Sequence, residues 1–157
     1  QTGHMVMSTL HTNDGPQTLT RLQDMGVQSF AVATSINLIT AQRLLRRLNP
    51  DNRVEIEMPD DALRKEDFPE EMIKAGMQLY GPGEETEENP GYKGRAGIYQ
   101  VMPISEDLKR LIIEEANAVQ LADQAAKEGV WDIRRSGLQK VADGITSLAE
   151  VNRVTVE

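Results

Sequence analysis

The sequence has 157 residues, a net charge of −8, 39% hydrophobic and 27% charged residues, and no cysteine. This size allows one domain with a core or a piece of a larger protein, and the composition is ordinary for a globular protein. No stretch is apolar for long enough to span a bilayer, and disulfides and thiolate metal sites are excluded. The sequence begins with neither Met nor a signal-type run, so we expect it to be part of a longer protein.

The negative charge is concentrated in one segment. Residues 49–93 carry 13 acidic and five basic side chains, whereas residues 1–48 carry two acidic and four basic ones. Residues 94–157 are closer to balance, with ten acidic and eight basic side chains. Because binding to nucleic acid requires neutralisation of phosphates, we expect no nucleic-acid partner.

Residues 1–48 predict one strand and two helices. A strand is expected over His4–Leu10, covered on both faces, because Met5, Val6 and Met7 are apolar at successive positions. A capping signal and Pro16 start a first helix, which Gly26 ends. A second, longer helix is expected over 29–48, from apolar positions spaced by three and four: Phe30, Thr34, Leu38, Ala41, Leu45 and Leu48.

Residues 49–93 contain five prolines and the acidic run from Gly81 to Glu88, so we expect a solvated insertion. A short helix near 70–77 is predicted there, and otherwise loop. After it, Ala96–Val101 predicts a strand, and helices are expected after Ser105, after Asn117 and over 130–142.

Ser147 followed by Glu150 predicts a capping box at the start of a last helix. The order of elements favours the later part of an α/β domain followed by an all-helical subdomain.

The two histidines, His4 and His11, are candidates for chemistry. Their separation of seven residues places them on opposite faces of a regular strand, which disfavours a shared metal ion. His11 stands where a strand is expected to end and a helix to begin, where ligands and phosphate oxygens collect in α/β sheets. The alternative is that both are ordinary polar residues at strand ends.

Two basic groups have a structural and a functional interpretation. Arg43, Arg46 and Arg47 would interact with the negative end of the predicted long helix, or contact a nucleotide or a neighbouring subunit. Gly94 and Arg95 lie in a glycine-rich stretch that lets a ligand approach the backbone, with the guanidinium against an adenine ring or phosphate. A tight turn with a surface arginine explains the same pattern.

Other catalytic patterns are absent from the sequence. No Lys is followed by Ser or Thr, so the chain contains no phosphate-binding P-loop. We therefore expect this chain alone neither to bind ATP tightly nor to hydrolyse it.

Five segments together resemble the PilB/GspE family of type IV pilus assembly and type II secretion ATPases. They are TGHMVMSTLHTND (Thr2–Asp14), which resembles the family's histidine box, LTRLQDMGV (Leu19–Val27), AQRLLRRL (Ala41–Leu48), GYKGRAGIYQVMPIS (Gly91–Ser105) and SGLQKVADGITSLAEVNRVT (Ser136–Thr155). They occur in the family's order and cover the chain except the insertion. The pilus-assembly type fits better than the retraction motor, which lacks the long insertion.

The resemblance implies an α/β fold, the C-terminal part of a RecA-like P-loop ATPase domain. The expected divisions are ATPase core over 1–48, an acidic insertion at the zinc-finger-like position over 49–93, and a core strand plus helical subdomain over 94–157. The implied protein is a cytoplasmic homo-hexamer, peripheral to the inner membrane, which uses ATP with Mg²⁺ and contacts an inner-membrane platform protein to polymerise pilin.

The resemblance also assigns residues. His11, together with His4, would lie near the terminal phosphate as catalytic residues, and Gly94 and Arg95 would lie near the adenine. Arg21 is a weaker candidate for a structural or intersubunit role. The P-loop, the acidic metal-binding residue and the arginine fingers are expected upstream of this sequence.

One departure from the family concerns zinc, which members often hold with two Cys-x-x-Cys pairs around the insertion. The corresponding positions here are Asn49, Asn52, Glu84 and Glu87. Amides bind zinc poorly, so we predict no metal site, with the insertion held by packing or loose.

Two other functions remain open at this stage: a type II secretion ATPase, and a noncatalytic module that docks neighbouring subunits.

Overall fold

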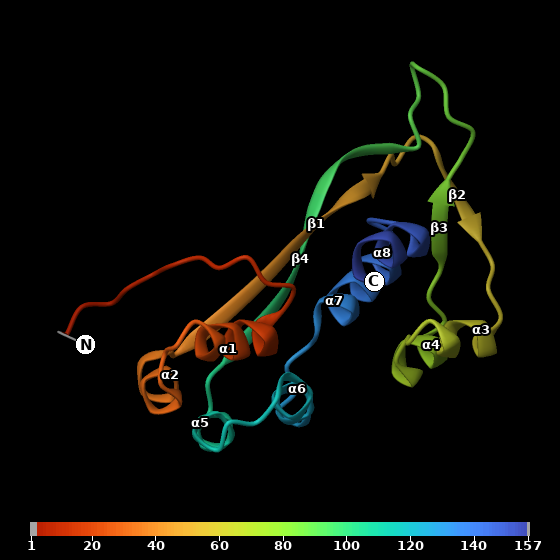
Figure 1. Cartoon of the computed structure of the whole chain (residues 1–157). Coiled ribbons are helices and arrows are strands. Elements are labelled where there is room, and N and C mark those ends of the chain that lie inside the picture. The colour runs from red at the N-terminus through yellow and green to blue at the C-terminus, as the bar shows by residue number, and fades with distance from the viewer. Residues whose placement is uncertain (1–2, 157) are drawn as a thin grey trace. The chain divides into compact units, whose positions relative to one another are not determined.

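The computed structural model describes residues 3–156, a mixture of α-helices and small β-sheets, as predicted for the fold class. The elements are α1 (Gly15–Asp24), α2 (Ser29–Ser35), β1 (Leu38–Leu48), β2 (Arg53–Ile56), α3 (Asp60–Lys65), α4 (Glu70–Ala75), β3 (Leu79–Pro82), β4 (Tyr92–Pro103), α5 (Glu106–Ile113), α6 (Ala118–Lys127), α7 (Ile133–Ala142) and α8 (Leu148–Thr155). β1 pairs with β4, and β2 pairs with β3 (Figure 1). Within residues 3–156 the helices are too short or too polar to cross a membrane.

The chain divides into two compact units. The first unit contains the residues up to Ala41 together with Tyr99–Asp132, and the second contains Gln42–Ile98 together with the residues from Ile133 onward. Strands β1 and β4 each contribute residues to both units. The three-part division at residues 48 and 93 stays a prediction.

The first unit is built from α1, α2, α5 and α6, which pack against one another. Its core consists of Leu19, Val32, Ala33, Ile39, Met102, Ile104, Leu108, Ile112, Ala116, Leu121 and Ala125. The helix starts predicted at Ser105 and Asn117 are confirmed, because both side chains accept a hydrogen bond from a backbone N–H three residues later. These caps fix where the two helices begin, and apolar residues spaced by four, Leu108 with Ile112 and Leu121 with Ala125, form their buried faces.

The second unit combines the β2–β3 sheet with α3, α4, α7 and α8. β2 and β3 are antiparallel, with Arg53 opposite Pro82 and Ile56 opposite Leu79. Helices α7 and α8 pack against each other and against β3. Arg134 of α7 donates hydrogen bonds to the carbonyl and carboxylate of Glu66, which follows α3, and so ties the two helical parts together.

The long helix predicted over 29–48 is wrong in its second half. The chain is helical only over Ser29–Ser35, and Leu38–Leu48 forms strand β1. From Leu38 to Leu45 the more exposed and the more buried side chains alternate, as in a strand, and both Ile39 and Leu45 are buried. Pairing with β4 therefore overrides an apolar spacing that also fits a helix.

The strand predicted over His4–Leu10 is also wrong. These residues are extended but belong to no sheet, and Met5, Val6 and Met7 are 90%, 80% and 88% exposed. A strand needs a neighbour to accept its hydrogen bonds, and no strand within residues 3–156 pairs with this segment. Thr2, at the start of the quoted histidine box, lies outside the described residues.

The segment 49–93 contains more regular structure than its composition predicts. The helix expected near 70–77 is confirmed as α4, but α3, β2 and β3 were expected to be loop. Leu63, Phe68, Ile73 and Leu79 are buried within the second unit. These apolar side chains contribute to the core of the second unit, although acidic residues dominate the composition of the segment.

Candidate functional site

His11 lies in the extended segment that leads into α1, in the first unit. Its side chain is exposed, as is that of His4. Because residues 4–10 form no strand, the two imidazoles are not held on opposite faces of a sheet. The imidazoles of His4 and His11 are therefore both accessible to a ligand.

The start of α1 is occupied by side chains of the same unit. Asp14 accepts a hydrogen bond from Gln17 N at 2.8 Å, and Gln100 Oε1 of β4 accepts one from Gly15 N at 2.9 Å. Pro16 has no N–H to offer. The expectation of free helix N–H groups for phosphate oxygens is therefore wrong here, and a carboxylate stands where the anion would lie.

Gly15 is required by the same close approach. A Cβ on this residue would lie 2.9 Å from the Met102 Cε and 3.2 Å from the Gln100 Oε1 atom. Both Gln100 and Met102 are buried, so the entry to α1 is fixed tightly against β4. His11 lies four residues before this closely packed start of α1.

Gly94 and Arg95 lie near the start of β4, in the second unit, and both are exposed. Gly94 has φ +83°, in the left-handed region that favours glycine. A Cβ there would meet Arg47 Cδ at 3.9 Å, so the Arg47 side chain lies beside this turn of the strand. Lys93 and Arg95, which flank Gly94 in the chain, are exposed, and so is the Gly94 backbone.

Arg46 has a different role from its neighbour Arg47. The interpretation of Arg43, Arg46 and Arg47 as partners of a helix end is wrong, because these residues belong to strand β1. The Arg46 guanidinium lies 4.2 Å from the centroid of the Tyr92 ring and donates to the Glu150 carboxylate from Nε and Nη2, at 3.1 and 2.9 Å.

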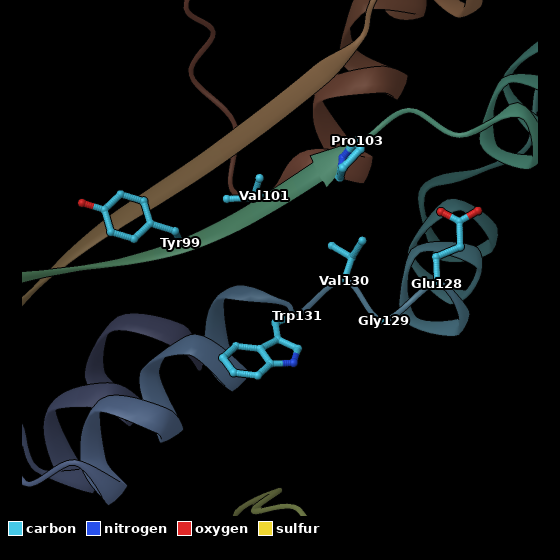
Figure 2. A pocket seen from close by; sticks show the side chains of 7 residues that line it. All are labelled: Tyr99, Val101, Pro103, Glu128, Gly129, Val130 and Trp131. Carbon is cyan, nitrogen blue, oxygen red and sulfur yellow. The ribbon is translucent and has the colours of Figure 1, made fainter.

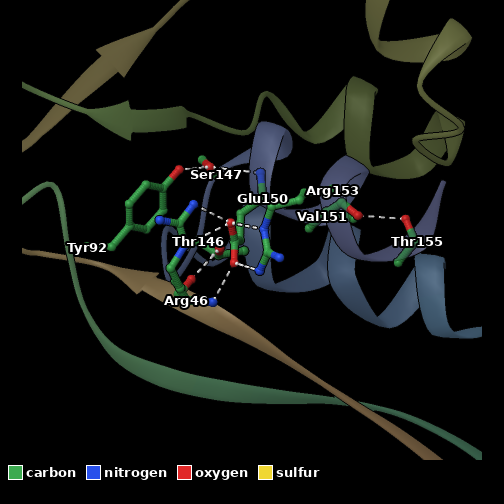
Figure 3. Close-up of polar contacts among 8 residues, drawn as sticks. All are labelled: Arg46, Tyr92, Thr146, Ser147, Glu150, Val151, Arg153 and Thr155. Carbon is green, nitrogen blue, oxygen red and sulfur yellow. Dashed lines mark hydrogen bonds and ion pairs between the residues drawn. The ribbon is translucent and has the colours of Figure 1, made fainter. Parts of the chain in front are cut away.

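Glu150 of α8 is at the centre of this polar network (Figure 3). Its side chain is fully buried and accepts hydrogen bonds from the Arg46 backbone N–H at 2.8 Å and from Arg153 Nε and Nη2 at 3.0 and 2.6 Å. Ser147 caps α8 as predicted, with its Oγ accepting from Glu150 N at 3.2 Å. The Glu150 carboxylate, however, turns to the two arginines instead of completing the predicted capping box.

Burial and the two neighbouring arginines have opposite effects on the pKa of the Glu150 carboxylate. Burial is the largest influence and by itself raises the pKa of Glu150, but the hydrogen bonds from Arg153 and Arg46 outweigh it and lower the pKa to about 2. Glu150 is therefore ionised at neutral pH and acts as a structural anion, not as a proton donor. Glu150 thus holds Arg46, and with it the adjoining part of β1, in place.

The same segment protects the edge of β1. Thr146 Oγ1 donates to the Arg46 carbonyl at 2.8 Å, and Leu48 N donates to the Ile145 carbonyl at 2.9 Å. Together with the Arg46 N–H bond to Glu150, these contacts use the backbone groups that a further strand would need. The β1 residues in the second unit are thus held by the C-terminal helical segment.

A shallow pocket of about 370 Å³ lies in the first unit, on the face of β4 opposite Gln100 and Met102. Figure 2 shows its lining residues: Tyr99, Val101, Pro103, Glu128, Gly129, Val130 and Trp131. The Glu128 carboxylate already accepts hydrogen bonds from Ser105 and Gln124. The pocket contains none of the residues that the sequence singles out.

The residues at the zinc-finger-like positions do not fit a zinc ion. Both amide nitrogens, of Asn49 and Asn52, donate to carbonyl oxygens, and Glu84 and Glu87 are exposed. Throughout residues 3–156 no three His, Cys, Asp or Glu side chains come close enough to hold a metal. Nitrogens that donate protons have no lone pair for zinc.

Comparison with known proteins identifies the family. The model of the family described as "Type II/IV secretion system protein" matches residues 1–153. The chain belongs to this family. The type IV pilus assembly ATPase PilB of Pseudomonas aeruginosa is 54% identical over 99% of this chain, and PilB of Acinetobacter baylyi is 49% identical over all of it.

The type II secretion system ATPase E of Vibrio cholerae is 40% identical over 99% of the chain. The chain spans only 27% of the length of both PilB relatives and 30% of the Vibrio protein. The secretion family assignment therefore confirms the resemblance read from the motifs, and most of each relative's length has no counterpart in this chain.

Two residues important for the geometry of this secretion-family chain make contacts that the sequence did not predict. Glu150 was expected to cap α8, although Arg153 three residues later is a readable partner for its charge. Nothing in the sequence points to the role of Gln100, which is a polar residue within an apolar strand. Its hydrogen-bond partner, Gly15 N, is 85 positions away. Only the folded chain brings such pairs together.

Proposed function

We propose that this chain is the C-terminal part of a cytoplasmic ATPase that powers type IV pilus assembly, hydrolysing ATP to drive pilin polymerisation. The observation that carries the proposal is the identity of 54% and 49% to two pilus assembly ATPases, against 40% to a type II secretion ATPase. The type II secretion ATPase is the alternative, supported by membership of the same family.

In this proposal the chain belongs to a RecA-like domain of a homo-hexamer at the inner-membrane face, with an inner-membrane platform protein as partner and without nucleic acid. The nucleotide is ATP with Mg²⁺, held mainly by a P-loop outside this sequence. Segment 49–93 is the acidic insertion between core segments, and no zinc is required.

His11 and His4 are proposed to face the terminal phosphate, and Gly94 and Arg95 the adenine. Exposure of all four residues supports this, as does the positive φ of Gly94 beside Arg47. An imidazole can donate a hydrogen bond to a phosphate oxygen, and a guanidinium can lie against an adenine ring. Because Asp14 and Gln100 occupy the start of α1, the contribution of this part of the chain to phosphate binding is proposed to come from the His11 side chain and not from helix N–H groups.

ATP turnover of the full-length protein tests these assignments. His11→Ala is expected to lower kcat by about 100-fold or more, because the variant lacks a hydrogen-bond donor that would stabilise the charge on the phosphoryl group in the transition state. Ser8→Ala, exposed in the same segment, is the matched control and is expected to leave turnover unchanged. Full turnover in the His11 variant, with assembly disturbed, would favour the noncatalytic docking function instead.

Arg95→Ala is expected to raise the KM for ATP by about tenfold and to change kcat little, because it removes a contact to the base. Arg110→Ala, exposed on α5, is the control for loss of a surface charge. This chain by itself is expected to show no ATP turnover. Deletion of the full-length gene is expected to abolish surface pili, whereas loss of protein secretion with intact pili would favour the type II alternative.

A further inference from the structure

Two loops of the second unit meet where β2 and β3 end. Residues 49–52 connect β1 to β2, and residues 83–91 connect β3 to β4. Because Arg53 is opposite Pro82 in the antiparallel sheet, the two loops lie at the same end of it (Figure 1). We call this pair of loops the asparagine knuckle, after Asn49 and Asn52.

Asn49 uses its whole amide group inside the knuckle. The side chain belongs to a residue that is only 4% exposed. Its Nδ2 donates to the Asn89 Oδ1 at 3.0 Å and to the Pro90 carbonyl at 2.8 Å, and its Oδ1 accepts from Asp51 N at 3.2 Å. Both protons and the oxygen are therefore satisfied, as a buried amide requires.

Asn52 fastens the same loop at a second place. Its Nδ2 donates to the Glu84 carbonyl at 3.0 Å and to the Asn89 carbonyl at 2.8 Å, so one amide group bridges both ends of the segment 84–89. Within that segment, Thr86 N and Asn89 N each donate to the other residue's carbonyl, at 3.3 and 3.2 Å. The two asparagines thus hold a loop that also closes on itself.

The backbone follows the same path closely. Asn49 N donates to the Gly91 carbonyl at 3.0 Å, and Gly83 N donates to the Asn52 carbonyl at 2.7 Å. A Cβ on Gly83 would lie 2.6 Å from Asn52 Oδ1, and one on Gly91 would lie 2.6 Å from Pro82 Cβ. Glycine is needed at both ends of the loop because the two chains approach so closely.

We infer that the Asn49 and Asn52 amides hold the knuckle without any metal, at two of the four positions where resembling proteins often use cysteines. Four amide protons face carbonyl or amide oxygens of the opposite loop, so the groups that would have to coordinate a cation donate hydrogen bonds instead. The segment is therefore folded and fastened at all metal concentrations. This inference does not depend on the ATPase assignment.

Hydrogen–deuterium exchange of the full-length protein, with and without EDTA, tests the inference. Asn49→Asp and Asn52→Asp keep the size of the side chain but replace the donating nitrogen with an anionic oxygen that faces carbonyls. We expect peptides covering 83–91 to exchange about tenfold faster or more in each variant. EDTA is expected to leave exchange of the unsubstituted protein unchanged.

The matched control is Asn117→Asp. The Asn117 Oδ1 accepts from Gln120 N at 2.9 Å at the start of α6, and Asp caps a helix as well as Asn does. This variant is expected to exchange like the parent protein. If Asn49→Asp fails to fold, Asn52→Asp alone carries the test, because Asn52 lies nearer the surface.

Two results would overturn the inference. One is a stoichiometric amount of zinc in the purified protein together with faster exchange over 83–91 on its removal. The other is unchanged exchange over 83–91 in Asn52→Asp. Loss of ATP turnover in any variant has no bearing on either result, so failure of the proposed function and failure of this inference are distinguishable.

Discussion

Replacing Glu150 with Gln removes one negative charge from a fully buried site and leaves the shape of the side chain intact. Glu150 accepts five hydrogen bonds from Arg46 and Arg153. The amide of Gln has one nitrogen that donates protons, and it would face guanidinium groups that also donate. The variant therefore has unmatched donors around α8.

The magnitude follows from the pKa of Glu150. An ordinary value of 4.5 in the unfolded chain and about 2 in the folded chain correspond to about 3 kcal/mol of stabilisation at neutral pH. Because the folded pKa is the lower one, this stabilisation is complete above about pH 4.5 and is lost as the pH falls towards 2. About 2 kcal/mol of it should be gone by pH 3.

Urea unfolding of the parent chain and of Glu150→Gln, followed by circular dichroism between pH 3 and pH 7, measures this effect. The variant is expected to be less stable by about 3 kcal/mol at pH 7, and the gap should narrow by about 2 kcal/mol at pH 3. Other carboxylates titrate in both proteins and cancel in the difference. Glu88→Gln, exposed in the loop before β4, is the control and should show no such narrowing.

A gap between the parent and Glu150→Gln that stays the same from pH 7 to pH 3 would refute the reasoning. It would mean that the Glu150 carboxylate gains nothing from Arg46 and Arg153 beyond what a neutral amide gains. The network of Arg46, Glu150 and Arg153 in Figure 3 would then have no stabilising role that depends on the charge of Glu150.

Two glycine substitutions test the backbone of the candidate site. Gly15→Ala is expected to lower the free energy of unfolding by about 1–2 kcal/mol, because the added Cβ would crowd Met102. A double variant with Met102→Leu should recover part of the loss, and an unchanged melting temperature in Gly15→Ala would contradict the close approach. Gly94→Ala is expected to cost about 1–2 kcal/mol because φ is +83°, whereas Lys93→Ala next to it should cost little; equal effects in urea unfolding would argue against the left-handed backbone.

Local signals in the sequence were reliable where neighbours along the chain provide the physics. Asp14, Ser105, Asn117 and Ser147 each cap a helix where a cap was expected, since the bond joins residues three apart. Likewise Gly26, with φ +90°, closes the turn after α1 as predicted. Such contacts need no tertiary partner, so the sequence contains all the information.

Predictions failed where the partner is distant. The apolar residues of 36–48 fit a helix stripe and a strand about equally well, and the presence of β4 makes them a strand. Segment 4–10 has the composition of a buried strand but no neighbour within the described residues. The acidic composition of residues 49–93 likewise led to a prediction of loop where the β2–β3 sheet forms. The pairing in this sheet joins residues more than 20 positions apart.

Motifs and helix caps are local patterns, so the family resemblance, the helix starts and the candidate residues His4, His11, Gly94 and Arg95 could be predicted without a structure. The folded chain was needed to show that Asp14 and Gln100 occupy the start of α1, that Glu150 is a buried anion and that Asn49 and Asn52 fasten a loop. Each of these depends on a hydrogen bond or ion pair between groups that folding brings together from 30 to more than 100 positions apart, Asp14 excepted. Such pairings depend on the whole packed chain, and for that reason no short pattern predicts them.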